Sequence, residues 1–188
     1  MKPEERIVVV GTSAGGLRAL ETILRDLPAA FSVPIVCVQH RARESTDAFP
    51  AVLARATKLP VREIDDEEPL SAPGVFLAPP DYHVLVEPGR LVLSTDDPVS
   101  FSRPSIDVLF ETAADAYGPN VIAVLLTGAN ADGARGVARV KQAGGIAIVQ
   151  DPQTAEAPEM PAAAISAAVI DRVLPLDDIA SELSRRVA

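Results

Sequence analysis

The sequence has 188 residues, of which 17 are Lys or Arg and 26 are Asp or Glu, so its formal net charge is −9. This acidic balance argues against a protein that binds nucleic acid or an anionic membrane surface. Hydrophobic residues make up 48% of the chain and aromatic residues 4%, which excludes a disordered chain and argues against a base-stacking platform. We expect one domain over residues 1–188, since chains of roughly 100–200 residues usually build a single core.

The single cysteine, Cys37, lies within an apolar run, which excludes a disulfide framework and leaves no cysteine cluster for zinc. The charged N-terminus, Met1 to Arg6, does not lead into the hydrophobic region of a signal peptide. No stretch approaches the roughly 18 apolar residues of a membrane span. We therefore expect a cytoplasmic protein without direct membrane insertion.

Short runs rich in Val and Ile alternate with longer segments of helical periodicity, which predicts an α/β fold. In the first half of the chain, strands are expected over residues 7–10, 33–38, 61–64 and 75–78, and helices over residues 17–27 and 47–57. The acidic run from Asp65 to Glu68 is expected to lie in a solvated loop. Residues 83–86 and 91–93 flank a short link with turn residues and predict an antiparallel hairpin.

The same alternation resumes in the second half of the chain. Helices are expected over residues 105–117, 133–143, 161–167 and 177–187, and strands over residues 121–126, 146–149 and 169–174. The sequence therefore predicts a doubly wound, mainly parallel sheet flanked by helices, with an added antiparallel β-hairpin.

The loop after the first strand fits the Gly-x-Ser-x-Gly pattern of a nucleophile elbow, with Ser13 between Gly11 and Gly15. Ligands of open α/β sheets bind at the carboxyl ends of strands. In such a turn Ser13 points its hydroxyl into a cleft, and N–H groups at the helix start can face a developing negative charge. Two other interpretations stay open: a dinucleotide-binding turn, in which Ser13 stands where a glycine is needed, and a helix start that Ser13 merely caps.

A serine nucleophile needs a base, and the chain contains two histidines. His40 directly follows the second strand, which would place it at the same sheet edge as Ser13 if the two strands are parallel. His83 opens the first hairpin strand. A structural role is the stronger interpretation for His83, while a peripheral part in the cleft stays open.

Asp132 is the first candidate for the group that accepts the second imidazole N–H and fixes the tautomer. It lies in the loop between the strand at residues 121–126 and the next helix. The competing interpretation is that Asp132 caps the helix that begins near Gly133, because aspartate is a favoured N-cap. Asp151, after the strand at residues 146–149, is the second candidate, and Asp107 competes from within a predicted helix.

Three loop segments carry a specific combination of motifs: Gly-Thr-Ser-Ala-Gly-Gly from Gly11, Val-Gln-His from Val38 and Leu-Leu-Thr-Gly-Ala-Asn-Ala-Asp-Gly-Ala from Leu125. Together they resemble the catalytic domain of the chemotaxis protein-glutamate methylesterases, the CheB family. The segments at residues 74–83, 103–107, 151–155 and 160–161 look like signatures of this family as well. The resemblance runs from about Arg6 to Asp171, nearly the whole chain.

The resemblance implies a serine esterase that hydrolyses glutamate γ-methyl esters on the cytoplasmic helices of chemoreceptors and releases methanol, with deamidation of receptor glutamines as a related activity. It implies Ser13 as the nucleophile, His40 as the base and Asp132 as the orienting carboxylate, with no metal or organic cofactor. The partners it implies are methylated chemoreceptor helices and a separate receiver or other signalling protein, with no nucleic acid.

The chain departs from the family pattern at two places near these residues. Many members follow the catalytic histidine with Met-Pro, where this chain has Arg41-Ala42, and many have Met where this chain has Ala129. Both changes stand where they could reshape the substrate cleft. Members often carry an N-terminal phosphorylatable receiver domain, and because the first strand begins at Ile7 we expect no such domain in this chain.

Two other functions stay open at the level of the sequence. One is hydrolysis of a small soluble ester by the same serine chemistry. The other is a nucleotide-binding or signalling scaffold without esterase activity, which thermal stabilisation by nucleotide without serine acylation would favour.

Overall fold

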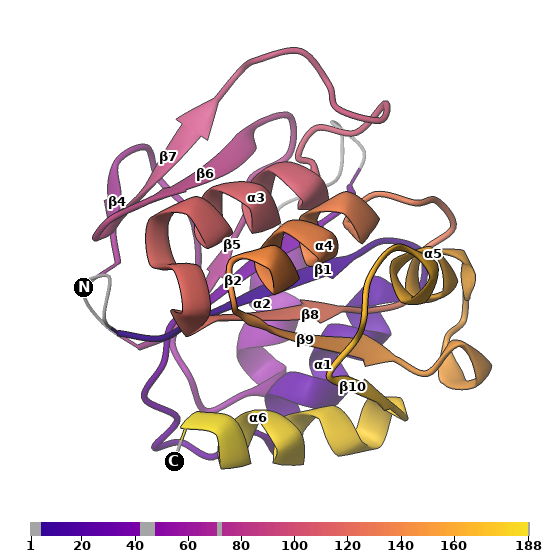
Figure 1. Ribbon diagram of the computed structural model, residues 1–188. Coiled ribbons are helices and arrows are strands. Elements are labelled where there is room, and N and C mark those ends of the chain that lie inside the picture. The colour runs from indigo at the N-terminus through magenta and orange to yellow at the C-terminus, as the bar shows by residue number, and fades with distance from the viewer. Residues whose placement is uncertain (1–4, 42–47, 71–72, 188) are drawn as a thin grey trace.

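A seven-stranded sheet forms the centre of the molecule (Figure 1). The computed structural model describes residues 5–41, 48–70 and 73–187. The strands follow the order β10-β9-β8-β1-β2-β5-β3, and all neighbours are parallel. They are β1 (Ile7–Thr12), β2 (Ile35–Gln39), β3 (Val61–Glu63), β5 (Val75–Leu77), β8 (Val121–Leu125), β9 (Ile146–Gln150) and β10 (Arg172–Leu174).

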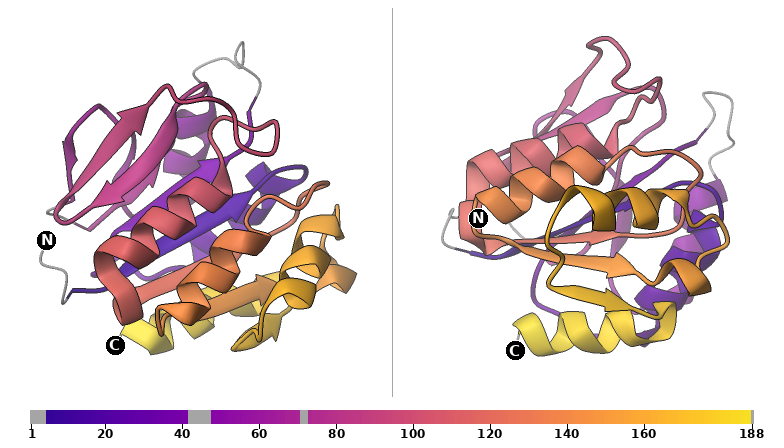
Figure 2. Two further views of the ribbon diagram at one scale, coloured as in Figure 1. Left: turned by 45° about the horizontal axis from the view of Figure 1, so that its top comes forward. Right: turned by 45° about the vertical axis from the view of Figure 1, so that its right-hand side comes forward.

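Helices cover both faces of this sheet, as the two views of Figure 2 show. One face carries α1 (Gly16–Asp26), α2 (Ala48–Ala56) and α6 (Ile179–Val187), and the other carries α3 (Ile106–Tyr117), α4 (Ala134–Gln142) and α5 (Glu159–Ala167). Ile7 and Val9 of β1 belong to the core under α3, whereas Val8 and Val10 belong to the core under α1. Successive strand side chains point to opposite faces, so a sheet covered on both sides needs continuous apolar runs.

A small antiparallel sheet lies beside α3. It consists of β4 (Glu68–Pro69), β7 (Arg90–Ser94) and β6 (His83–Glu87), in this order. The pairing of β6 with β7 confirms the predicted hairpin. Three of its side chains share one core cluster with α3: Val84, Val86 and Leu91.

The expectation that Asp65 to Glu68 forms only a solvated loop is wrong at its last residue. Glu68 pairs with Leu91 as part of β4, and its carboxylate accepts a hydrogen bond of 2.9 Å from Arg62 Nε. The ion pair with Arg62 compensates the negative charge of Glu68 in the strand. The local sequence pattern does not show this pairing.

Several element boundaries differ from the expected ones. The start of the second helix was expected at Asp47, which lies outside the described residues. The strand expected over residues 169–174 is limited to Arg172–Leu174, the residues that pair with β9. The last helix is preceded by a 3₁₀ turn (Leu176–Asp178), and similar turns lie at Gly118–Asn120 and Pro152–Thr154.

β1 is the topological switch point of the sheet: the strands that directly follow it in sequence lie on the β2 side, and the later strands lie on the β8 side. The crevice outside the carboxyl ends of such strands is where open α/β sheets bind ligands. Ser13 follows β1, His40 follows β2, and the loop with Asp132 follows β8. The fold therefore brings the three segments to one edge of the sheet. Within the described ranges, none of the helices combines the length and hydrophobicity that a bilayer-spanning helix needs.

Candidate active site

Ser13 lies half-buried in the turn between β1 and α1. Its N–H donates to the Thr127 carbonyl (2.9 Å), and its carbonyl accepts from the Gly16 N–H (2.9 Å). The left-handed residue of this turn is Gly15, with φ of 77°, where a side chain would strain the backbone. The Ser13 hydroxyl makes no hydrogen bond to any residue that the structure describes. The turn is thus held through its own N–H and carbonyl groups, and the Ser13 hydroxyl is left available.

His40 leaves the sheet beside Ser13. Thr12 and Gln39 are register partners in β1 and β2, and the His40 N–H donates to the Thr12 carbonyl (3.1 Å). The side chain of Gln39 ties the two loops together, because its Nε2 donates to the carbonyls of Ser13 (2.8 Å) and His40 (2.9 Å). The expected parallel pairing of the two strands, on which the common placement of Ser13 and His40 depended, is confirmed.

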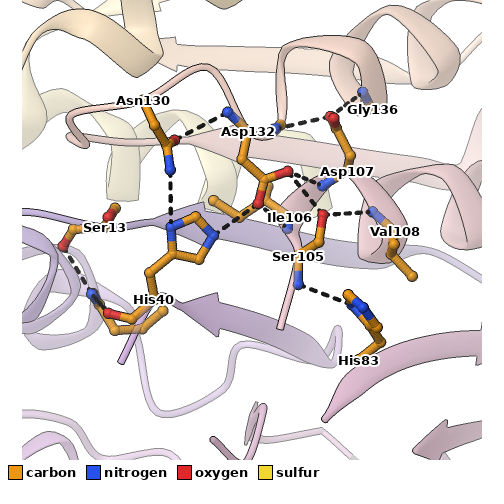
Figure 3. Close-up of polar contacts among 12 residues, drawn as sticks. Ser13, His40, His83, Ser105, Ile106, Asp107, Val108, Asn130, Asp132 and Gly136 are labelled. Carbon is orange, nitrogen blue, oxygen red and sulfur yellow. Dashed lines mark hydrogen bonds and ion pairs between the residues drawn. The ribbon is translucent and has the colours of Figure 1, made fainter. Parts of the chain in front are cut away.

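The imidazole of His40 lies between Ser13 and Asp132 in Figure 3. Its Nε2 is 2.8 Å from Asp132 Oδ2, and its Nδ1 is 3.5 Å from Asn130 Nδ2. A carboxylate can only accept, so Nε2 carries the proton of the neutral ring and Nδ1 keeps its lone pair. Asn130 Oδ1 accepts the Asp132 N–H (3.0 Å), which directs the Asn130 amide N–H groups to Nδ1. The nitrogen able to take a proton is therefore Nδ1, on the Ser13 side.

Asp132 is buried, with 1% of the residue exposed, and its carboxylate receives four donors. Besides His40, these are Ile106 N (2.7 Å), Asp107 N (3.0 Å) and Ser105 Oγ (2.9 Å). Ser105 is the N-cap of α3, so the carboxylate lies at the N-terminus of that helix, where the helix dipole favours negative charge.

The pKa of Asp132 lies below its ordinary value. Burial alone would raise this pKa, but the hydrogen bond from His40 and the N–H groups of Asp107 and Ile106 outweigh the effect of burial. Asp132 is thus ionised at neutral pH and can stabilise a positive charge on His40.

The competing interpretation, in which Asp132 caps the helix near Gly133, is not borne out. The N–H groups of Gly133 (2.9 Å) and Gly136 (2.8 Å), at the start of α4, donate instead to Asp107 Oδ1. The N-termini of α3 and α4 lie side by side. Asp132, just before α4, therefore accepts from the start of α3, and Asp107, in the first turn of α3, accepts from the start of α4. Burial raises the pKa of the Asp107 carboxyl, although the N–H of Gly136 opposes this shift.

The other two candidates have structural partners. Asp151 caps the 3₁₀ turn that follows it, accepting from Gln153 N (2.9 Å). His83 is buried; its Nδ1 accepts the Ser105 N–H (3.2 Å), and its Nε2 lies 3.2 Å from the Asp97 carbonyl. Both ring nitrogens of His83 therefore hold the segment that leads into α3, which is the structural interpretation preferred for this residue.

Sequence reasoning missed three side chains that organise the site: Gln39, Ser105 and Asn130. Two of them carried a signal. Gln39 stands inside the Val-Gln-His motif, and Asn130 precedes Asp132 by two residues, the spacing of an Asx turn. Ser105 donates to a carboxylate 27 residues away, a contact that no local pattern indicates.

Two hollows open next to this group of residues. One, of about 280 Å³, is lined by His40, Arg41 and the segment 101–104. The other, of about 370 Å³, includes Ser13, Leu17 and Gln39 in its lining. Across residues 5–41, 48–70 and 73–187, no group of three or more His, Cys, Asp or Glu side chains is placed to hold a metal ion.

Comparison with known proteins identifies the family of this chain. A family model described as CheB methylesterase matches residues 8–183. A relative from Leptospira interrogans is 46% identical over 174 residues, which cover 92% of this chain and 90% of the relative. The protein-glutamate methylesterase/protein-glutamine glutaminase 2 of Anaeromyxobacter dehalogenans is 43% identical over 173 residues, covering 92% of this chain and 51% of that protein.

The fold has a counterpart among solved structures. The crystal structure of the Thermotoga maritima CheB methylesterase catalytic domain superposes with a TM-score of 0.92 at 35% sequence identity, and the match covers 97% of this chain and 99% of that one. The sequence match extends over the sheet, both helical layers and the loops that hold Ser13, His40 and Asp132. This chain belongs to the CheB methylesterase family.

Proposed function

We propose that this chain is a protein-glutamate methylesterase, which hydrolyses glutamate γ-methyl esters on chemoreceptor helices and deamidates certain receptor glutamines. Ser13 is the nucleophile, His40 the base and Asp132 the orienting carboxylate. The observation that carries this proposal is the 2.8 Å contact between His40 Nε2 and Asp132, with Ser13 on the adjacent strand end. It supports a triad of the Ser-His-Asp type.

The first half of the reaction is acylation. Ser13 Oγ attacks the carbonyl carbon of the ester while His40 Nδ1 gives up its long contact with Asn130 (3.5 Å) and takes the hydroxyl proton. The resulting oxyanion is stabilised by N–H groups in the first turn of α1 after Gly16, whose own N–H donates to the Ser13 carbonyl. When the C–O bond to the methoxy group breaks, His40 returns the proton to the leaving oxygen. Methanol departs, and the glutamyl group stays on Ser13 as an ester.

The second half of the reaction is hydrolysis of this ester. A water molecule gives a proton to His40 Nδ1 and attacks the acyl carbon, and Ser13 Oγ leaves with the proton that His40 returns. The products are a glutamate side chain and the free enzyme. With a glutamine substrate the same steps release ammonia in place of methanol. Throughout, ionised Asp132 stabilises the transient imidazolium and keeps Nδ1 directed at Ser13.

The biological setting is a further part of the proposal. We place the protein in the cytoplasm, with methylated chemoreceptor helices as its substrate and a separate receiver or other signalling protein as its regulator. The support for this setting is membership of the CheB methylesterase family.

The decisive experiment measures methanol released from receptor membranes that carry radiolabelled methyl esters. We expect release above the rate of membranes alone. A panel of short-chain esters and a nucleotide melting screen run beside it. A folded protein that releases no methanol would reject the proposal; turnover of short-chain esters would then favour the small-ester enzyme, and stabilisation by nucleotide the scaffold.

Asp132→Asn is expected to slow methanol release at least about 10²-fold. Asn can offer its N–H to the imidazole and favour the wrong tautomer. The structure adds a stability effect, because Asn has one acceptor oxygen for the four donors that surround Asp132. We expect the free energy of unfolding to fall by about 1–3 kcal/mol, so turnover is measured well below the melting temperature. Near-normal turnover of the folded variant would reject the role of Asp132.

The same variant tests the charge of Asp132. The pKa of Asp132 is lowered in the folded protein, so ionisation contributes stability that is present above the unfolded pKa of about 3.9 and is lost as the pH falls through the folded value. Urea titrations of both proteins between about pH 5 and pH 2 should therefore show a smaller loss of stability in Asp132→Asn. Parallel losses would mean that this carboxylate is not held ionised.

A further inference from the structure

Two exposed apolar side chains line the two hollows next to the candidate site. Phe101 is fully exposed (104%) and lines the hollow that contains His40. Leu17, in the first turn of α1, is 39% exposed and lines the hollow that contains Ser13. An exposed Leu is ordinary on a protein surface, but a phenylalanine with no cover beside a candidate active site requires an explanation.

The turn that carries Phe101 has a strained backbone. Phe101 has φ of 64° and Ser100 φ of 51°, in the left-handed region where a bulky residue is an outlier. Strain of this kind persists where the surrounding structure enforces it, and it concentrates at functional sites. Val99 and Ser102 enforce it here, because they exchange two backbone hydrogen bonds of 3.1 and 2.9 Å across the turn.

The next residue, Arg103, anchors the turn to the rest of the fold. Its guanidinium donates to Asp81 Oδ1 (2.7 Å) and to the carbonyls of Thr95 (2.7 Å) and Asp96 (3.0 Å). Phe101 is therefore held out from the surface by a fixed turn. A small ester inside the hollow would not need a side chain that points into solvent, whereas a macromolecular substrate lying over the hollow would meet it.

We propose that Phe101 and Leu17 contact the substrate helix that carries the esterified glutamate, one on each side of the ester. The inference rests on the proposed function and explains how that site prefers a protein substrate to a small ester. A helix presents side chains three and four positions from the glutamate on the same face. Apolar side chains at those positions would lie against Leu17 and Phe101 while the ester enters between Ser13 and His40.

The chain offers matched controls for both residues. Ile165 has the same exposure as Leu17 (39%), and Val169 is 86% exposed. Neither lines either of the two hollows. Substitutions at these two positions remove exposed apolar surface of a similar kind without touching the proposed contact.

The test compares kcat/KM for methylated receptor with kcat/KM for a short-chain nitrophenyl ester. Phe101→Asn should lower the ratio of the two at least about fivefold, and Leu17→Ala should lower it by a smaller factor. Asn tolerates the left-handed region, so Phe101→Asn should melt at or above the wild-type temperature. Val169→Asn and Ile165→Ala should leave the ratio unchanged.

The outcomes separate this inference from the function itself. If the wild type demethylates the receptor and Phe101→Asn keeps the wild-type ratio, the contact is wrong and the function stands. An equal loss on both substrates would also overturn the contact, because it would assign Phe101 to the chemistry. If the wild type hydrolyses the nitrophenyl ester and leaves the receptor methylated, the proposed function fails, and the contact with it.

Discussion

Ser13→Ala is expected to abolish methanol release from methylated receptor, with turnover at least about 10⁴-fold below wild type. The hydroxyl is the only group removed, and it makes no hydrogen bond among the described residues. The turn around it is held by the backbone contacts to Thr127 and Gly16. The variant should therefore melt within about 2 °C of wild type.

The measurement is single-turnover methanol release, with trapping of the acylated serine by mass spectrometry as a second readout. Ser166→Ala, on the exposed face of α5, is the matched control and should keep full activity. A Ser13→Ala protein that retains a tenth of the wild-type turnover would end the assignment of the nucleophile.

His40→Gln is expected to lose about as much activity as Ser13→Ala, since removing either partner of a nucleophile–base pair costs nearly as much as removing both. Gln can still donate to Asp132 but offers no nitrogen that takes a proton near neutral pH. His83→Gln is the internal comparison. It should lose less than about tenfold in turnover, because the His83 ring bonds to Ser105 N and to the Asp97 carbonyl and not to Ser13, His40 or Asp132.

The order of the two histidine variants should be reversed for stability: His83→Gln should be the more active variant and the less stable one. His83 is buried with both ring nitrogens engaged, so His83→Gln leaves polar groups unpaired and should melt lower than His40→Gln. Turnover and melting curves of the pair are measured side by side. A more active His40→Gln than His83→Gln would transfer the role of the base to His83.

The placement of Ser13 and His40 could be predicted because it depends on one local rule. Residues that follow two parallel strands leave the sheet at the same edge, and both strands were visible as apolar runs. The order of the seven strands could not be predicted, since it depends on pairings between segments far apart in the chain. The Val-Gln-His motif contains Gln39, but the partners of its side chain could not be predicted for the same reason, because the register of β1 and β2 sets them.

Asp132 shows the limit of local reasoning more clearly. The residue type and its position after β8 indicated a functional carboxylate, but the nearest helix in sequence was the wrong partner. Its carboxylate accepts from N–H groups at the start of α3, because α3 and α4 pack with their N-termini together. Asp107 takes the place at α4 that the competing interpretation gave to Asp132. The packing of α3 against α4 decides which helix N-terminus the Asp132 carboxylate contacts. A short window of sequence carries no sign of that packing.

The exchange of carboxylates between α3 and α4 has a consequence for when the protein becomes active. Ser13 and His40 both lie within the first 40 residues, whereas the carboxylate that holds the imidazole comes from position 132. A growing or partly folded chain can pair β1 with β2 and still lack a base that is correctly oriented. On the proposed mechanism, full activity therefore requires β8 to pair with β1 and both helices to dock, so a partly folded chain hydrolyses esters slowly.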